Sequence, residues 1–268
     1  MRSMMLCLAL LMFAVVAPAR DEAVVEHSSD YDMVLVHGLG ADASIWNEII
    51  SPLRRGFNVW SFELPGHGST QPVPDATIDR FAELLADYID AEGIRNPALV
   101  GHGMGGLIAM RYAFDHPDLI HRLVLIDAAP KQLATDEQKS AIAQQLITNY
   151  DHFVANFYLN MSPREAVNQR AVDMALRTDQ ITFQQLLMSS FDFDVTGDLA
   201  VQAIPIMLIG SSMMFPDPDV ARETMNLMGF NKARAISFKT MPQLGHYVML
   251  EQPPYVASVI AAFCGFQE

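Results

Sequence analysis

A glycine-rich turn in the middle of the chain is the segment in which residue type and spacing most directly suggest chemistry. An apolar run at residues 98–100 breaks into Gly101-His102-Gly103-Met104-Gly105-Gly106 and then into a helical pattern. Such a strand–turn–helix directs backbone N–H groups toward whatever lies at the helix N-terminus, where they stabilise negative charge. Two chemistries use this arrangement, and they predict different proteins.

The first chemistry is dinucleotide binding. Gly101, Gly103 and Gly106 fit the pattern G-x-G-x-x-G, and Asp127 follows Gly106 by 21 residues, at the end of the next apolar run. In this interpretation the helix N-terminus binds the pyrophosphate and the aspartate binds the ribose. The protein would then be an NAD(P)-dependent oxidoreductase.

The second chemistry is nucleophilic catalysis at the turn G-x-S-x-G, in which a strained strand-to-helix turn exposes a serine. Gly101 and Gly105 are then the flanking glycines, and residue 103 occupies the nucleophile position. Because residue 103 is glycine, this interpretation predicts the frame of a serine hydrolase without its serine.

Composition limits the partners. The 268 residues are 51% hydrophobic, which is enough for one α/β domain with a substantial core. The formal net charge of −14 and the lack of a basic cluster disfavour nucleic acid and anionic lipid as partners. We expect no cofactor and no metal.

The N-terminal segment has the features of an export signal. Arg2 precedes an apolar run from Met4 to Val16, and Ala17-Pro18-Ala19 has the form of a secretory cleavage site. The run of 13 residues is shorter than the roughly 20 that a membrane span needs, which disfavours the alternative of a retained transmembrane anchor. Residues 1–19 are therefore predicted to be a signal peptide, and the mature protein, residues 20–268, to be secreted or periplasmic. Cleavage leaves Cys264 as the only cysteine, so no intramolecular disulfide is expected.

The elements that must position the glycine turn alternate between strands and helices. Apolar runs of β character occur at 33–36, 57–62, 98–100, 123–126 and 206–209, with a further short strand expected at 23–25. Helical periods occur at 46–53 and 78–89. This alternation predicts a mostly parallel, doubly wound α/β sheet with helices on both faces.

Four segments in order resemble the α/β-hydrolase superfamily over residues 33–263. They are His37-Gly38 followed by Trp46, Leu64-Pro65-Gly66-His67-Gly68, Pro205-Ile206-Met207-Leu208-Ile209-Gly210, and Gly245-His246 followed by Glu251-Gln252-Pro253. The resemblance implies a relation to hydrolases of small-molecule esters and acyl compounds. It also implies a catalytic His246, an oxyanion hole formed by the N–H groups of Leu39 and Met104, and a pocket that includes His37, Gly38 and His102.

The chain departs from the family pattern at the catalytic residues. Besides Gly103, the usual acid position holds Met213, which cannot orient an imidazole. The superfamily has a second acid position at the end of the strand after the elbow helix, and Asp127 occupies it. An Asp127–His246 dyad is therefore one interpretation, and a structural role for Asp127 is the other. At its N-terminal edge the sheet is expected to have fewer strands than is usual in the family.

Residues 131–200 carry helical patterns at 137–158, 163–177 and 181–191, where the superfamily inserts a helical lid. A lid there would shape an apolar pocket over the elbow.

Three functions remain open on the sequence. The first is a ligand-binding or interaction protein without hydrolase activity, which binds a small apolar carbonyl or carboxylate compound or an unidentified protein partner. The second is a hydrolase or lyase in which His246 and Asp127 act as a general base on water or substrate. The third and most remote is the NAD(P)-dependent oxidoreductase.

Overall fold

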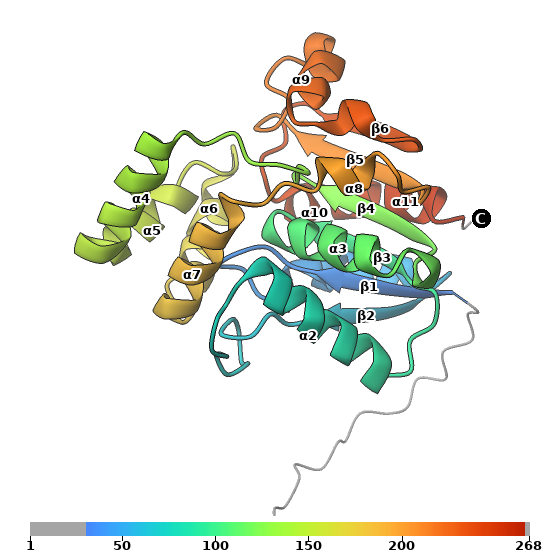
Figure 1. Cartoon of the computed structure of the whole chain (residues 1–268), viewed down its shortest axis with the longest axis horizontal. Coiled ribbons are helices and arrows are strands. Elements are labelled where there is room, and N and C mark those ends of the chain that lie inside the picture. Colours follow the sequence, from blue (N-terminus) through green and yellow to red (C-terminus); the bar gives the residue numbers. More distant parts are fainter. Residues whose placement is uncertain (1–30, 266–268) are drawn as a thin grey trace, which may run out of the picture.

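A computed structural model describes residues 31–265 and contains a six-stranded sheet in which every neighbouring pair of strands is parallel (Figure 1). The strand order is β2-β1-β3-β4-β5-β6. The strands are β1 (Asp32–Val36), β2 (Asn58–Phe62), β3 (Ala98–His102), β4 (Arg122–Ile126), β5 (Ile206–Ser211) and β6 (Ile236–Met241). The predicted doubly wound α/β sheet is confirmed.

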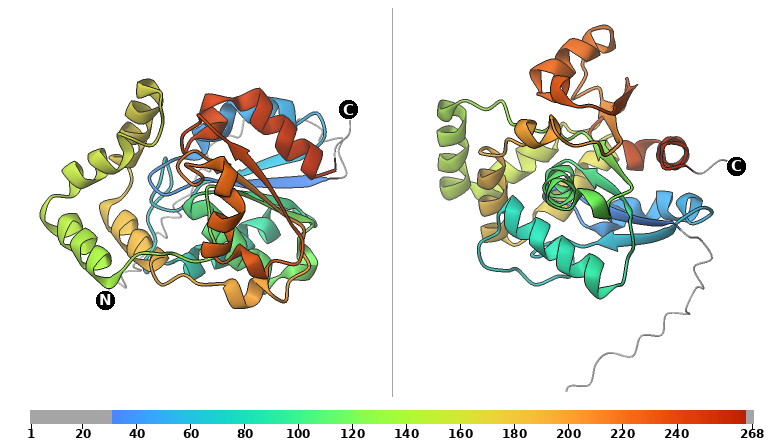
Figure 2. Two further views of the ribbon diagram at one scale, coloured as in Figure 1. Left: turned by 90° about the horizontal axis from the view of Figure 1, so that it is seen from above. Right: turned by 45° about the vertical axis from the view of Figure 1, so that its right-hand side comes forward.

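Helices cover both faces of the sheet, which explains why its central strands read as continuous apolar runs. On one face α1 (Asn47–Leu53) packs against α11 (Pro253–Phe263), and on the other α2 (Ile78–Ala91) packs against α3 (Met104–Asp115) (Figure 2). All five residues of β3 are buried as a result. The glycine turn therefore follows a strand that is buried along its whole length.

The chain between β4 and β5 is helical, as the sequence predicted, and stands beside the sheet (Figure 1). It contains α4 (Asp136–Thr148), α5 (Tyr150–Tyr158), α6 (Glu165–Ala175), α7 (Gln180–Ser190) and α8 (Thr196–Leu199). The single helical period expected at 137–158 is two helices, because Asn149 between them leaves helical geometry with φ −154° and ψ 49°. We refer to residues 131–200 as the lid segment.

Short helical turns complete the connections. The period expected at 46–53 divides into η1 (Ala43–Trp46) and α1, while η2 (Pro117–Leu119) precedes β4. The chain after β5 forms η3 (Pro218–Val220), α9 (Ala221–Leu227) and η4 (Phe230–Lys232) before returning as β6, and α10 (Val248–Glu251) follows that strand.

The N-terminal predictions fall mainly outside the described residues. The signal peptide at 1–19 and the short strand at 23–25 both precede residue 31. Within residues 31–265, β1 is the first strand and β2 forms the outer edge, in agreement with a cut-back N-terminal edge. No helix in this range is both long and apolar enough to span a bilayer.

Candidate functional site

Gly103 occupies the turn between β3 and α3 with φ 51° and ψ −118°, a region that side chains rarely adopt. The flanking glycines allow strand and helix to approach closely. A Cβ on Gly105 would lie 2.3 Å from the carbonyl oxygens of both Val36 and His37, and one on Gly101 would lie 2.5 Å from the Gly105 oxygen. The backbone of this turn is therefore fixed by close packing, whatever residue stands at 103.

His246 faces this turn from the loop between β6 and α10. A Cβ built on Gly103 would lie 3.1 Å from His246 Nε2. On the other side of the ring, Nδ1 is 3.0 Å from Asp127 Oδ2. The backbone N–H of His246 donates to the Met161 oxygen at 2.6 Å, which ties the loop to the lid segment. Gly103, His246 and Asp127 thus meet at one point, although they lie far apart in the sequence.

Asp127 is held at the end of β4 by the neighbouring strand β5. Its Oδ1 accepts from the Ser211 backbone N–H at 2.7 Å, and its Oδ2 accepts from the Ser211 hydroxyl at 2.5 Å. The side chain is only 3% exposed. An ionised carboxylate only accepts, so the histidine N–H points at Asp127 and Nε2 is left as the acceptor that faces Gly103. The aspartate is thereby engaged with an imidazole, which removes it from the ribose-binding role of the dinucleotide interpretation.

Met213 lies beside this acid and does not replace it. Its side chain is half exposed, and its backbone N–H donates to the Ser211 hydroxyl at 3.0 Å. The hydroxyl of the neighbouring Ser212 donates to the Leu244 carbonyl oxygen instead. The carboxylate nearest to His246 is therefore that of Asp127.

The two residues predicted to form the oxyanion hole both line the cavity above Gly103. Met104 opens α3 and Leu39 lies in the loop after β1. In the part of the chain that the structure describes, neither backbone N–H has a hydrogen-bond acceptor. Tyr158 of α5 donates to the Leu39 carbonyl oxygen at 2.6 Å and so fixes this loop from the lid side. The role of the two amides in stabilising an oxyanion stays a prediction.

His37, Gly38 and His102 do not line the cavity, contrary to the sequence prediction. They are packed behind it, and both histidine side chains are almost completely buried. His102 Nε2 is 3.0 Å from the carbonyl oxygen of His246, and the two imidazole centroids are 4.3 Å apart. Burial lowers the pKa of His102 well below its usual value. His102 therefore acts as a neutral support under His246.

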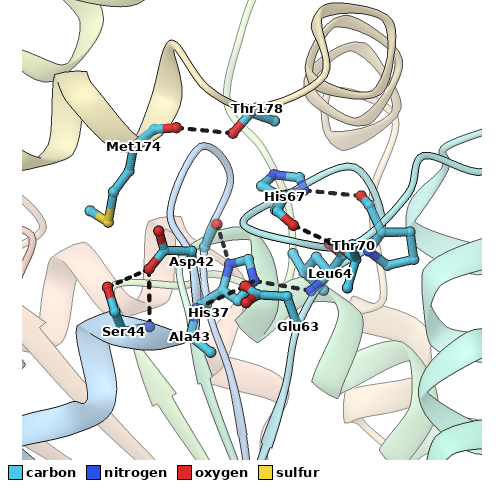
Figure 3. Close-up of polar contacts among 12 residues, drawn as sticks. His37, Asp42, Ala43, Ser44, Glu63, Leu64, His67, Thr70, Met174 and Thr178 are labelled. Carbon is cyan, nitrogen blue, oxygen red and sulfur yellow. Dashed lines mark hydrogen bonds and ion pairs between the residues drawn. The ribbon is translucent and has the colours of Figure 1, made fainter. Parts of the chain in front are cut away.

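A second group of mostly buried polar contacts lies around the loop after β1 (Figure 3). His37 Nε2 lies 3.0 Å from both the Leu64 backbone N–H and Glu63 Oε1, and Glu63 Oε1 also accepts from the Ala43 N–H at 2.8 Å. Burial lowers the pKa of the nearby His67 to about 3. These contacts connect the loops after β1 and β2, which explains why their histidines are structural.

The cavity above the dyad has a volume of about 450 Å³, within the usual range for small-molecule sites. Most of its lining is apolar and comes from the elbow, the lid segment and the loop after β5. Its residues are Leu39, Gly103, Met104, Leu107, Asp127, Ala128, Ala129, Lys131, Gln132, Leu133, Ile142, Phe157, Tyr158, Met161, Leu187, Ser190, Phe191, Met213, Met214, Met228 and His246. Across residues 31–265, no group of three or more His, Cys, Asp or Glu side chains is placed to hold a metal ion.

Sequence reasoning missed Ser211 as the support of Asp127, and Tyr158 and Met161 as lid contacts to the site. A signal for Ser211 existed, because parallel neighbouring strands end at the same edge of a sheet and Ser211 comes two residues after the predicted strand 206–209. Nothing in the helical pattern singles out Tyr158 or Met161, since both contacts depend on how the lid segment is placed against the core.

Known proteins resemble this chain over most of its length. A model of the alpha/beta hydrolase family matches residues 33–259. The pimeloyl-[acyl-carrier protein] methyl ester esterase of Vibrio cholerae is 25% identical over 217 residues, covering 75% of this chain and 84% of its own length. The protein of the same name from Yersinia enterocolitica is 25% identical over 248 residues, covering 87% and 93%.

Solved structures show the same fold. The enol-lactonase of Burkholderia xenovorans superposes with a TM-score of 0.77 at 20% identity, covering 89% of this chain and 92% of its own. The bromoperoxidase of Bacillus anthracis superposes with a TM-score of 0.78 at 19% identity, covering 88% and 92%.

Proposed function

The chain belongs to the alpha/beta hydrolase family, and we propose that it binds a small carbonyl or carboxylate compound without forming a serine acyl-enzyme. The observation that carries the proposal is Gly103. We infer that it stands at the nucleophile position, because its missing Cβ would lie 3.1 Å from His246 Nε2. A serine at this site would place its hydroxyl next to the imidazole, whereas glycine leaves nothing to attack a carbonyl carbon.

The serines at or next to the cavity lining and the one cysteine of residues 31–265 are not placed to replace that nucleophile. The hydroxyl of Ser211 is held by Asp127, and that of Ser190, the serine in the cavity lining, donates to the Leu187 carbonyl oxygen. Cys264 is buried in α11's C-terminal turn away from the cavity, and burial raises its pKa to about 12. Both kinds of candidate are thus unreactive.

The site nevertheless retains features that bind a carbonyl group. Among residues 31–265 the amides of Leu39 and Met104 have no acceptor, His246 lines the same space, and most of the surrounding wall is apolar. Two backbone donors directed at one oxygen stabilise partial negative charge with no help from residue 103. We infer that they hold the oxygen of a bound ligand.

The test is chemical labelling of the mature protein. We expect no reaction with a fluorophosphonate probe and no burst of nitrophenol from an activated ester, because both require a nucleophilic serine. The Gly103→Ser variant serves as the positive control for both reagents. Stoichiometric labelling of any serine in the unmodified protein would refute the proposal.

The intact dyad favours a second candidate function. His246 is oriented by Asp127, and its Nε2 faces the cavity, so it can take a proton from a water molecule or directly from a substrate. In this case an activated ester would be hydrolysed slowly, without a burst, and His246→Gln would abolish the reaction. Equal rates for the unmodified protein and the His246→Gln variant would exclude this role.

NAD(P) binding is the remaining alternative. A shift of several degrees in the melting temperature with millimolar NAD or NADP would support it.

Export belongs to the same proposal. We infer that residues 1–19 are removed as a signal peptide, on the strength of Arg2, the apolar run 4–16 and the small residues around Ala19. N-terminal sequencing of the protein recovered from the native host should begin at Arg20. Recovery of the intact Met1 N-terminus from the membrane fraction would indicate a retained anchor.

A further inference from the structure

The mostly apolar lining of the cavity over Gly103 includes two polar groups, which we call its poles. The first is formed by Asp127 and His246, which bond to each other. The second is formed by Lys131 and Gln132 at the start of the lid segment. Of these side chains, Asp127 and His246 are engaged with each other, whereas Lys131 stands apart from them.

The remaining polar side chains of the lining are satisfied inside the protein. Tyr158 donates to the Leu39 carbonyl oxygen, and Ser190 donates to the Leu187 carbonyl oxygen. Within residues 31–265, by contrast, Lys131 Nζ forms no salt bridge, and the Gln132 side chain has no hydrogen-bond partner. The charge of Lys131 does help to lower the pKa of Asp194, but that carboxylate is exposed, so water screens its attraction for the ammonium group.

The backbone fixes Lys131 at this place. It pairs with Asp194 in an antiparallel bridge, and the Gln132 N–H lies 3.4 Å from the Phe193 oxygen. The aliphatic stem of Lys131 passes the turn at Gly229, where a Cβ would lie 3.6 Å from Lys131 Cε. Met228, next to that turn, also lines the cavity, so the aliphatic stem of Lys131 lies beside the apolar part of the lining.

We propose that Lys131 binds the anionic end of the ligand whose carbonyl group lies at His246, so that the ligand class is a short acyl compound with a negatively charged far end. This proposal rests on the function proposed for the cavity. It adds Lys131 as a second binding group for the same ligand. Asp127 and Lys131 are four residues apart, and four residues span at most about 14 Å, which limits the separation of their Cα atoms.

The apolar middle part of such a ligand fits the apolar part of the cavity lining. Met104, Met161 and Met214 contribute flexible thioether chains, which adapt to a linear methylene chain more readily than branched side chains do. The anionic group could be a carboxylate or a phosphate, because a lysine ammonium binds either as a point charge.

The experiment measures binding of three probes to the mature protein by isothermal titration calorimetry, with chromatography to verify that each ester stays intact. Monomethyl adipate carries an ester and a free carboxylate, dimethyl adipate carries two neutral ends, and methyl 6-phosphonohexanoate replaces the carboxylate with a phosphonate. We expect the unmodified protein to bind one of the anionic probes about 10- to 100-fold more tightly than the diester, the usual strength of a hydrogen bond to a charged group.

Variants assign the preference to Lys131. Lys131→Met should abolish the discrimination and leave diester affinity unchanged, whereas Lys131→Arg should keep it. Lys232→Met is the matched control, because Lys232 also lies near Asp194 but does not line the cavity. If the diester binds as well as both anions to the unmodified protein, the Lys131 inference is wrong and the cavity proposal survives. If none of the three probes binds, both proposals fail for this ligand class.

Discussion

His246 and Gly103 face each other across the site, but the protein supports them in different ways. His246 depends on a chain of side-chain contacts, from its imidazole through Asp127 to Ser211, with His102 packed beneath it. The Gly103 turn depends on backbone packing, because Gly105 lies against the end of β1 too closely for a Cβ. One side of the site is therefore built from side chains, and the other keeps its geometry with no side chain at all.

The difference has an energetic consequence. An ordinary residue in a strained turn costs about 1–3 kcal/mol, and glycine avoids most of that cost. Removing a partner from the buried carboxylate Asp127 would have the opposite sign and cost about 3–5 kcal/mol, because an unpaired charge would remain. Glycine at residue 103 is thus compatible with a more stable fold, whereas removal of His246 alone, which would leave Asp127 unpaired, is not. This asymmetry is what the function proposed for the site requires, because the turn does not depend on a side chain at residue 103.

The largest expected effect comes from restoring the missing side chain. Gly103→Ser should hydrolyse short-chain nitrophenyl esters, because its Cβ would lie 3.1 Å from an imidazole that Asp127 already orients. Adding Asp127→Asn in this background should lower kcat by about 10⁴, as expected when the acid no longer selects the correct tautomer. Steady-state assays of the two proteins measure the effect.

The control for that comparison is Gly103→Ala, which has the Cβ without the hydroxyl and should show no burst of nitrophenol. If Gly103→Ser were as inactive as Gly103→Ala while remaining folded, the His246–Asp127 pair would not be able to activate a serine. The proposed contrast between the two sides of the site would then be wrong.

The next effect concerns the support of the acid. Ser211→Ala removes the hydroxyl that bonds to Asp127 Oδ2 but keeps the backbone N–H that bonds to Oδ1. In the Gly103→Ser background we expect kcat to fall about 10- to 100-fold, corresponding to the roughly 1.5–3 kcal/mol of a hydrogen bond to a charged group. Ser212→Ala is the matched control, since its hydroxyl bonds only to Leu244. Equal rates for the two variants would assign Ser211 no role in orienting the dyad.

Much of the site could be predicted from the sequence because it depends on strand ends. Gly103 and Asp127 follow two adjacent parallel strands, and the carboxyl edge of a sheet brings such residues together. The pocket was predicted less well. The motifs do not distinguish His37 and His102 from residues that line the cavity. Only the packing of His37 against His67, and of His102 against Tyr247, shows that the two side chains are covered. Contacts from the lid segment depend on tertiary packing, which the helical period of 137–158 does not encode.

A third prediction concerns the strain that glycine avoids. Gly103→Ala should lower the free energy of unfolding by about 1–3 kcal/mol, because φ is 51° and the new methyl would press on the imidazole. Gly197→Ala is the control, since a Cβ there meets nothing within 4 Å and alanine favours the short helix α8. Urea unfolding measures both. A Gly103→Ala protein as stable as the parent would mean that the turn is not strained.

The fourth prediction concerns the buried, structural His67. The pKa of His67 in the folded state is about 3, below its unfolded value of about 6.5, so the unfolded chain takes up the proton first as the pH falls. The folded state should therefore lose about 1.4 kcal/mol per pH unit from this group between pH 6.5 and pH 3, and be unaffected above pH 6.5. Urea unfolding at pH 7, 6 and 5 should show a shallower pH dependence for His67→Gln than for the parent. Parallel pH profiles would contradict a neutral, structural His67.

The smallest expected effect tests which acid serves His246. Met213→Asp places a carboxylate at the usual family position, but that side chain is half exposed and Asp127 already bonds to Nδ1. In the Gly103→Ser background we therefore expect kcat to change by no more than about twofold, the usual range for a surface substitution of about 0.5 kcal/mol. If Met213→Asp raised kcat by orders of magnitude, Asp127 would be holding the loop rather than the imidazole. The same substitution combined with Asp127→Asn sharpens the test, because partial recovery there, with none in the presence of Asp127, would show that the two positions compete for one nitrogen atom.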